Sequence, residues 1–158
     1  MKGDPKVVAL LNEVLTAELT AINQYFLHAK MCQHWGYEAL HARARKESID
    51  EMKHADKVIH RILYLDGLPN LQKLNTLNIG QTVVEQLKAD LAVEVDAVKR
   101  LNDGITYCRS VNDNGTSDLL EEILVEEEDH IDWIETQLET IKQIGEQNYL
   151  TEQLKSDD

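Results

Sequence analysis

The sequence has few of the residues that interrupt helices. Its 158 residues include only two prolines and seven glycines. Long stretches are rich in Leu, Glu, Lys, Ala and Gln, which favour helix formation. A chain of this length forms one ordinary domain with a buried core. The composition therefore predicts a single all-α domain over residues 1–158.

Two further scarcities narrow the class of protein. No apolar run approaches the roughly 20 residues that a transmembrane helix needs, and the first residues, Met1 to Pro5, lack the apolar core of a signal peptide. Basic residues are outnumbered, since 16 Lys and Arg stand against 29 Asp and Glu and give a net charge of −13. Such a charge argues against a nucleic-acid partner. We therefore expect a cytoplasmic protein that binds neither a membrane nor nucleic acid.

Cysteine is also scarce. The chain has only Cys32 and Cys108, and neither belongs to a Cys-x-x-Cys metal motif or a Cys-x-x-Cys-His haem attachment. We expect both thiols to be reduced and to serve in packing.

The sequence does contain a repeated acid and histidine pattern. Glu51 and His54 form a Glu-x-x-His motif, and Glu127 and His130 form a second one with both residue numbers larger by 76. Residues three apart on a helix share one face, so each motif would project its two side chains together. A single such motif in an acidic helical protein more often lies on a solvated face, whereas two motifs at a fixed spacing favour a binding site.

Two isolated glutamates extend the repeat. Glu18 and Glu94 also differ by 76, and each precedes its own Glu-x-x-His by 33 residues. Each of them lies within the apolar stripe of its predicted helix, whereas a surface glutamate would lie outside that stripe. We therefore predict that both carboxylates point into the core.

The resulting set of four carboxylates and two imidazoles is typical of a two-metal site in a helical bundle. Four buried carboxylates without partners would be costly, whereas two divalent cations balance their charge. Ligation by many oxygens and one imidazole per metal suits iron or manganese better than structural zinc.

Apolar residues recur at steps of three and four along four segments. We expect helices from Pro5, capped by Asp4, to about Trp35, from 37 to 65, from 82 to 111, and from a cap at Thr116 or Ser117 to Gly145, with a short fifth helix within 148–154. The roughly fifteen residues between the second and third helices are too many for a tight turn. They fit the long crossover of a ferritin-like four-helix bundle.

In the acidic run 126–129 only Glu127 shares the face of His130, and we expect the other three acids to face solvent.

Several segments resemble those of the bacterioferritins over essentially the whole chain. They are MKGD at the start, AINQYFLHA at 21–29, ESIDEMKHAD at 47–56, GLPNL at 67–71 and EDHIDW at 128–133. The resemblance implies a ferroxidase that oxidises Fe(II) with dioxygen or hydrogen peroxide and stores a ferric mineral in a hollow homo-oligomeric shell of twenty-four subunits. It also implies two irons in each subunit. The implied ligands are Glu51 and Glu127 as bridges, Glu18 and Glu94 as terminal carboxylates, and His54 and His130 as one imidazole for each iron.

The resemblance gives Met52 a further role. Beside Glu51 on the helix, Met52 points about 100° away from the ligand face, and alone it would be read as core filler or an interface residue. In bacterioferritins the methionine at this place ligates haem b from both sides of a two-fold interface between subunits. The implied pocket wall is formed by Leu19, Asn23 and Phe26, and the implied electron donor for iron release is a small ferredoxin.

The chain departs from the family pattern at Arg45 and Lys46, where relatives commonly have Tyr and His. Arg45 alters the surroundings of the haem, and Lys46 removes an accessory iron ligand, which leaves Glu47 and Asp50 at most a weak transit site. Tyr25 either supplies an electron during oxidation or only packs and hydrogen-bonds.

Two alternatives remain for the function. A rubrerythrin-like di-iron peroxidase shares the paired motifs but normally carries a Cys-x-x-Cys pair, which this chain lacks. A non-catalytic haem or metal carrier would hold metal without consuming oxidant, so iron-dependent oxidant consumption separates it from a ferroxidase.

Overall fold

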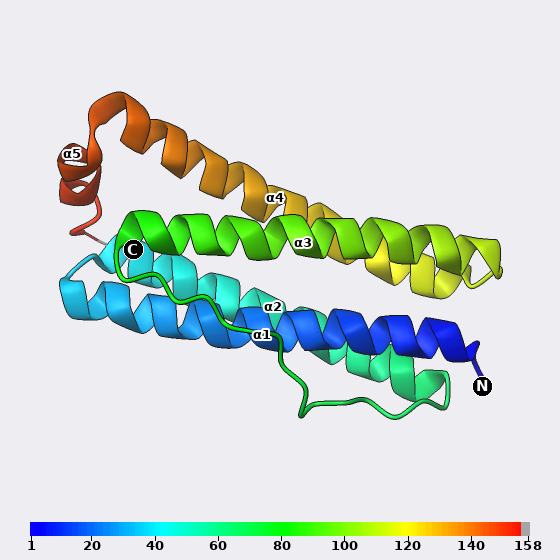
Figure 1. Cartoon of the computed structure of the whole chain (residues 1–158). Helices are drawn as coiled ribbons and strands as arrows, with labels where there is room; N and C mark the ends of the chain where they lie inside the picture. Colours follow the sequence, from blue (N-terminus) through cyan, green and yellow to red (C-terminus); the bar gives the residue numbers. More distant parts are fainter. Residues whose placement is uncertain (156–158) are drawn as a thin grey trace.

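The computed structural model describes residues 1–155, which form four long helices and a short fifth one (Figure 1). The elements are α1 (Pro5–Trp35), α2 (Glu38–Tyr64), α3 (Val83–Ser110), α4 (Asn114–Ile144) and α5 (Glu146–Thr151). The described part of the chain has no strand. This confirms the predicted ferritin-like four-helix bundle with a short C-terminal helix. Within the same residues, no helix is both long and apolar enough to cross a membrane.

The helix ends follow local chemistry. The Asp4 side chain accepts hydrogen bonds from the amides of Lys6 and Val7, which fixes the start of α1, and Gly36 ends that helix with a φ of 90°. The predicted cap of α4 at Thr116 or Ser117 is wrong. Asp113 caps this helix instead and accepts from the Thr116 amide, and an ion pair with Arg61 at 2.9 Å holds its carboxylate in place.

The long crossover runs in extended form along the bundle from α2 to α3 (Figure 1). A polar stripe on α1 holds this segment through its backbone. The acceptors are Thr20 Oγ1, Gln24 Oε1 and His28 Nε2, and the amide donors are those of Asn75, Asn78 and Gly80. These bonds satisfy backbone groups that the segment could not pair within itself.

The core consists of two apolar clusters at opposite ends of the bundle. The first includes Val7, Leu11, Leu15, Val58, Ile62, Leu101, Leu120 and Ile123. The second includes Cys32, Leu40, Val83, Leu87, Ile134 and Tyr149. On every long helix the residues between these clusters include a buried carboxylate. These buried carboxylates form a polar layer in the middle of the bundle, and the two apolar clusters separate this polar layer from solvent at both ends of the bundle.

Both cysteines pack as predicted. Cys32 and Cys108 are buried and free. Burial raises the pKa of the Cys32 thiol to about 12 and that of the Cys108 thiol to about 11. Neither thiol is therefore poised to react as a thiolate.

Candidate metal centre

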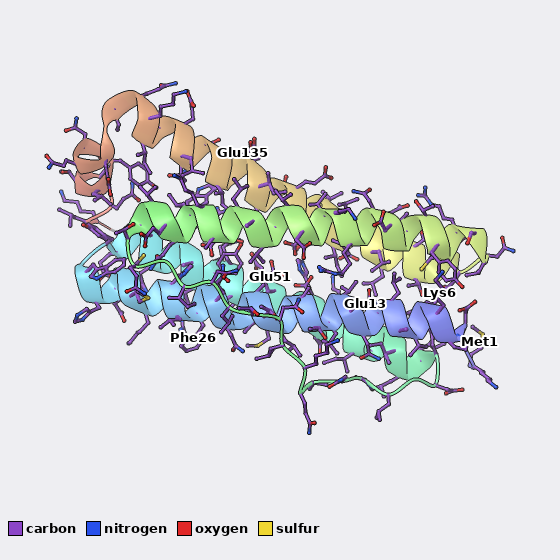
Figure 2. The ribbon with its side chains drawn as sticks, in the orientation of Figure 1. Met1, Lys6, Glu13, Phe26, Glu51 and Glu135 are labelled. Atoms are coloured by element: carbon purple, nitrogen blue, oxygen red, sulfur yellow. The ribbon has the colours of Figure 1, made fainter. Side chains whose placement is uncertain are left out.

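All six predicted site residues lie in the polar layer, on the four long helices. Their relative exposure ranges from 1% to 6%. They are Glu18 on α1, Glu51 and His54 on α2, Glu94 on α3, and Glu127 and His130 on α4. Figure 2 shows Glu51 midway along the bundle. The 76-residue repeat thus corresponds to the two helical hairpins, each of which supplies one glutamate from its first helix and a Glu-x-x-His from its second.

The side chains form two groups that share two members. One contains Glu18, Glu51, His54 and Glu127; the other contains Glu51, Glu94, Glu127 and His130. In each group one ligand atom from every residue lies within 4.8 Å of the others. Glu51 and Glu127 belong to both groups, so their carboxylates can each contact two ions.

In the first group, the ring of His54 turns Nδ1 toward the carboxylates. This atom lies 3.0 Å from Glu127 Oε1, 3.4 Å from Glu51 Oε2 and 3.6 Å from Glu18 Oε2. Two ligand atoms that each lie about 2.1 Å from one ion at tetrahedral or octahedral angles are roughly 3.0 to 3.4 Å apart. Two of the three distances around His54 lie within this range and the third exceeds it by 0.2 Å, which a small side-chain movement would remove, so the group can surround a single ion.

The second group has nearly the same geometry. His130 Nδ1 lies 3.3 Å from Glu51 Oε1, 3.4 Å from Glu94 Oε1 and 3.6 Å from Glu127 Oε2. Glu51 and Glu127 present one oxygen to each histidine. This is the arrangement that two bridging carboxylates require.

The buried carboxylate oxygens of the two groups are suited to bind cations. Buried acceptors are nearly always hydrogen-bonded, yet five carboxylate oxygens of the described residues lack a hydrogen-bond partner. They are Glu18 Oε2, Glu47 Oε2, Glu51 Oε1, Glu94 Oε2 and Glu127 Oε1. Four of the five belong to the two groups. Divalent cations would satisfy these oxygens and balance their charge.

Burial and mutual contacts shift the pKa values of the site. Burial, with the nearby carboxylates, raises the pKa of Glu18 and that of Glu94 well above the usual range. For His54 and His130 burial alone would lower the pKa, but close contacts with the surrounding glutamates outweigh it and raise the pKa of both imidazoles. The metal-free site therefore holds protons that a metal ion must displace.

The acids next to the motif behave differently from one another. Glu128 and Asp129 are exposed, as predicted. Glu126 is half-exposed, but its Oε2 lies 2.5 Å from His54 Nε2, so the prediction of a purely solvent-facing acid was incomplete. The available signal was chemical: a metal-binding histidine usually donates its second ring N–H to an acceptor.

A third group of potential ligands adjoins the site and contains Glu47, Asp50 and His130. Both of its carboxylates already contact a cation, because Arg43 Nε lies 2.6 Å from Glu47 Oε1 and Lys46 Nζ lies 2.9 Å from Asp50 Oδ2. This group is therefore less suited to hold a further cation than the two main groups.

Tyr25 adjoins the second group. Its hydroxyl donates a hydrogen bond to Glu94 Oε1, and burial together with Glu94 and Asp90 raises the pKa of the phenol. The phenol thus remains protonated and orients one terminal carboxylate of the site.

Met52 lies outside the metal centre, on the exposed face of α2. Its relative exposure is 56%, and Phe26 on α1 and Ile49 on α2 are also exposed. Figure 2 shows Phe26 on the side of α1 away from α3. Ile49 and Met52 lie three residues apart and therefore share one exposed face of α2. Apolar side chains that gather on an exposed face are typical of a surface that another molecule covers.

The comparison with known proteins agrees with this fold. The family model of the ferritin-like domain matches residues 8–144. Bacterioferritin BfrA of Mycobacterium tuberculosis is 56% identical over 149 residues, which cover 94% of each chain. The bacterioferritin of Mycobacterium leprae is 54% identical over the same shares, and that of Streptomyces coelicolor is 52% identical over 96% of this chain and 90% of the relative. The chain therefore belongs to the bacterioferritins, within the ferritin-like family.

Proposed function

We propose that the chain is a ferroxidase as well as an iron store. Iron storage is the function of the family to which it belongs. In the proposed reaction two Fe(II) ions bind as substrate in the two groups and are oxidised to Fe(III). The two electrons reduce one hydrogen peroxide to two waters, or one dioxygen to hydrogen peroxide, with uptake of two protons.

One observation carries this proposal: two sets of ligand atoms share Glu51 and Glu127. Shared carboxylates hold two ions close together, so a single oxidant can take one electron from each ion. The four carboxylates balance the charge of two Fe(II) ions, and the apolar clusters on both sides exclude bulk water. The buried imidazoles and carboxyl groups release protons when the ions bind.

We also propose that Met52 ligates haem b at a two-fold interface, with Met52 of a second copy on the opposite side of the haem. The exposed apolar side chains of Phe26 and Ile49 fit the hydrophobic faces of a porphyrin, and a thioether is an ordinary ligand of haem iron. Bound there, haem would carry electrons. The assembly that we propose is a homo-oligomeric shell of twenty-four subunits, with a small ferredoxin as the donor for iron release.

The test of the ferroxidase proposal is removal of single ligands. Glu127→Ala and His130→Ala should each abolish rapid Fe(II) oxidation in stopped-flow absorbance. Circular dichroism and assembled mass should remain those of the wild type, since apolar packing supports the bundle at both ends of the site. Glu128→Ala, in an exposed acid of the same helix turn, serves as the control and should oxidise iron at the wild-type rate. Rapid oxidation by either ligand variant would show that the reaction takes place elsewhere.

A further inference from the structure

Each histidine of the metal centre contacts a carboxylate from the opposite hairpin through its second ring nitrogen. His54 Nε2, on α2, lies 2.5 Å from Glu126 Oε2 on α4. His130 Nε2, on α4, lies 2.6 Å from Glu47 Oε2 on α2, a close contact without hydrogen-bond alignment. The two contacts cross between the same two helices and leave each Nδ1 facing the cluster.

The two outer carboxylates differ in how firmly they are held. The Glu126 side chain is 47% exposed, whereas that of Glu47 is 5% exposed. Glu47 also accepts a hydrogen bond of 2.6 Å from Arg43 Nε through its other oxygen. A solvated carboxylate reorients easily, while a buried one with a charged partner does not.

Arg43 is itself held by α4. Its guanidinium carbon lies 4.4 Å from the centre of the Trp133 ring, and Trp133 follows His130 by three residues. Arg43 thus contacts α4 through the Trp133 ring and contacts His130 indirectly through Glu47. In the Glu18–His54 half of the metal centre, the half-exposed Glu126 takes the corresponding place.

We propose that Arg43 is a positioning residue that fixes His130 through Glu47, so that the Glu94–His130 position binds metal first and the Glu18–His54 position exchanges more readily. The inference rests on the two-metal function proposed above. Outer partners of metal-binding histidines typically change metal affinity by about 10-fold to 100-fold. A difference between the two outer carboxylates therefore becomes a difference between the two metal positions.

An electrostatic role and a positioning role of Arg43 predict opposite changes in metal affinity when Arg43 is removed. If its positive charge mattered most, removal would strengthen the binding of cations nearby. If its position matters most, removal frees Glu47 and His130 and weakens binding at one position. The direction of the change in affinity therefore distinguishes the two roles.

The experiment uses Co(II) as the probe and Arg43→Met as the variant. Arg100→Met is a matched control, because Arg100 on α3 is similarly exposed and also pairs with an acid four residues away, at 2.7 Å, outside the metal centre. Absorption titrations of the metal-free wild type and of both metal-free variants should show two Co(II) per subunit. In Arg43→Met one of the two should bind about tenfold more weakly, and in Arg100→Met neither should change.

The order of filling is tested in crystals with one Co(II) per subunit. Anomalous scattering should place most of the cobalt between Glu94 and His130, and in Arg43→Met this preference should disappear. Equal occupancy of both positions in the wild type would overturn the proposal, as would an Arg43→Met variant that binds both ions as tightly as the wild type, or more tightly. A wild type that binds fewer than two Co(II) ions would overturn the proposed function itself.

Discussion

Replacement of Glu94 by glutamine tests what the burial of this carboxylate costs the protein when metal has been removed. Glu94 is 1% exposed, and burial with the neighbouring Glu127 raises its pKa well above the usual range. Glutamine keeps the size of the side chain and the oxygen that accepts from Tyr25, but it cannot ionise. We expect Glu94→Gln to stabilise the metal-free protein at neutral pH.

The magnitude follows from proton linkage. A carboxyl group whose pKa is raised in the folded protein contributes stability below its ordinary pKa of 4.5 and loses it as the pH rises. The resulting cost rises by at most about 1.36 kcal/mol per pH unit, and it reaches at most about 3.4 kcal/mol at pH 7 and about 0.8 kcal/mol at pH 5. Glutamine avoids this cost. For a chain of this size the gain in Tm is therefore at most about 7 to 14 °C at pH 7 and about 1.5 to 3 °C at pH 5.

The assay is thermal unfolding of chelator-treated protein, followed by circular dichroism at both pH values and at equal protein concentration. Glu128→Gln, in an exposed acid, is the control and should leave Tm unchanged at either pH. Added Co(II) should raise the Tm of the wild type more than that of Glu94→Gln, since the variant has lost a ligand. The reasoning is refuted if Glu94→Gln is less stable than the wild type without metal at pH 7, or if its gain is the same at pH 5.

Three further predictions concern haem, the third ligand group and protons. Met52→Leu preserves side-chain volume, so it should keep the assembled mass and fast iron oxidation but lose haem absorbance after reconstitution; stoichiometric haem with an unchanged spectrum would contradict this. Crystals soaked in Fe(II) should show no well-occupied iron bound through Asp50, because Lys46 already pairs with it at 2.9 Å. Co(II) binding should release protons and weaken as the pH falls from 7 to 5.5, since the pKa values of the imidazoles and of Glu18 and Glu94 are raised. Calorimetry in buffers of different ionisation enthalpy measures the number of protons released, and Co(II) binding that does not depend on pH would contradict the prediction.

The sequence predicted the helices and the six buried residues because both depend on periodicity. Glu18 and Glu94 stand where the apolar stripe requires a core residue, so their burial followed from their place in the pattern. The cap of α4 did not follow, since Asp113, Thr116 and Ser117 are all good capping residues. The choice depends on the ion pair between Asp113 and Arg61, which joins residues 52 positions apart.

The outer contacts of the histidines also required the structure. Glu126 and Glu47 reach His54 and His130 across the gap between α2 and α4, and helical spacing within one segment gives no information about the register of two helices. The role of Arg43 depends in the same way on Trp133, which lies 4.4 Å away on the other hairpin. Such contacts between hairpins determine how the predicted ligands are held.

The most direct test of the central claim is a titration of metal-free protein with Fe(II), in which the rapid oxidation phase is recorded by stopped-flow absorbance. Glu51 and Glu127 are shared between two groups of ligand atoms, so the amplitude of the rapid phase should rise linearly and saturate at about two Fe(II) per subunit. Saturation at one Fe(II) per subunit, or a rapid phase that grows without saturation, would contradict oxidation at a two-metal centre.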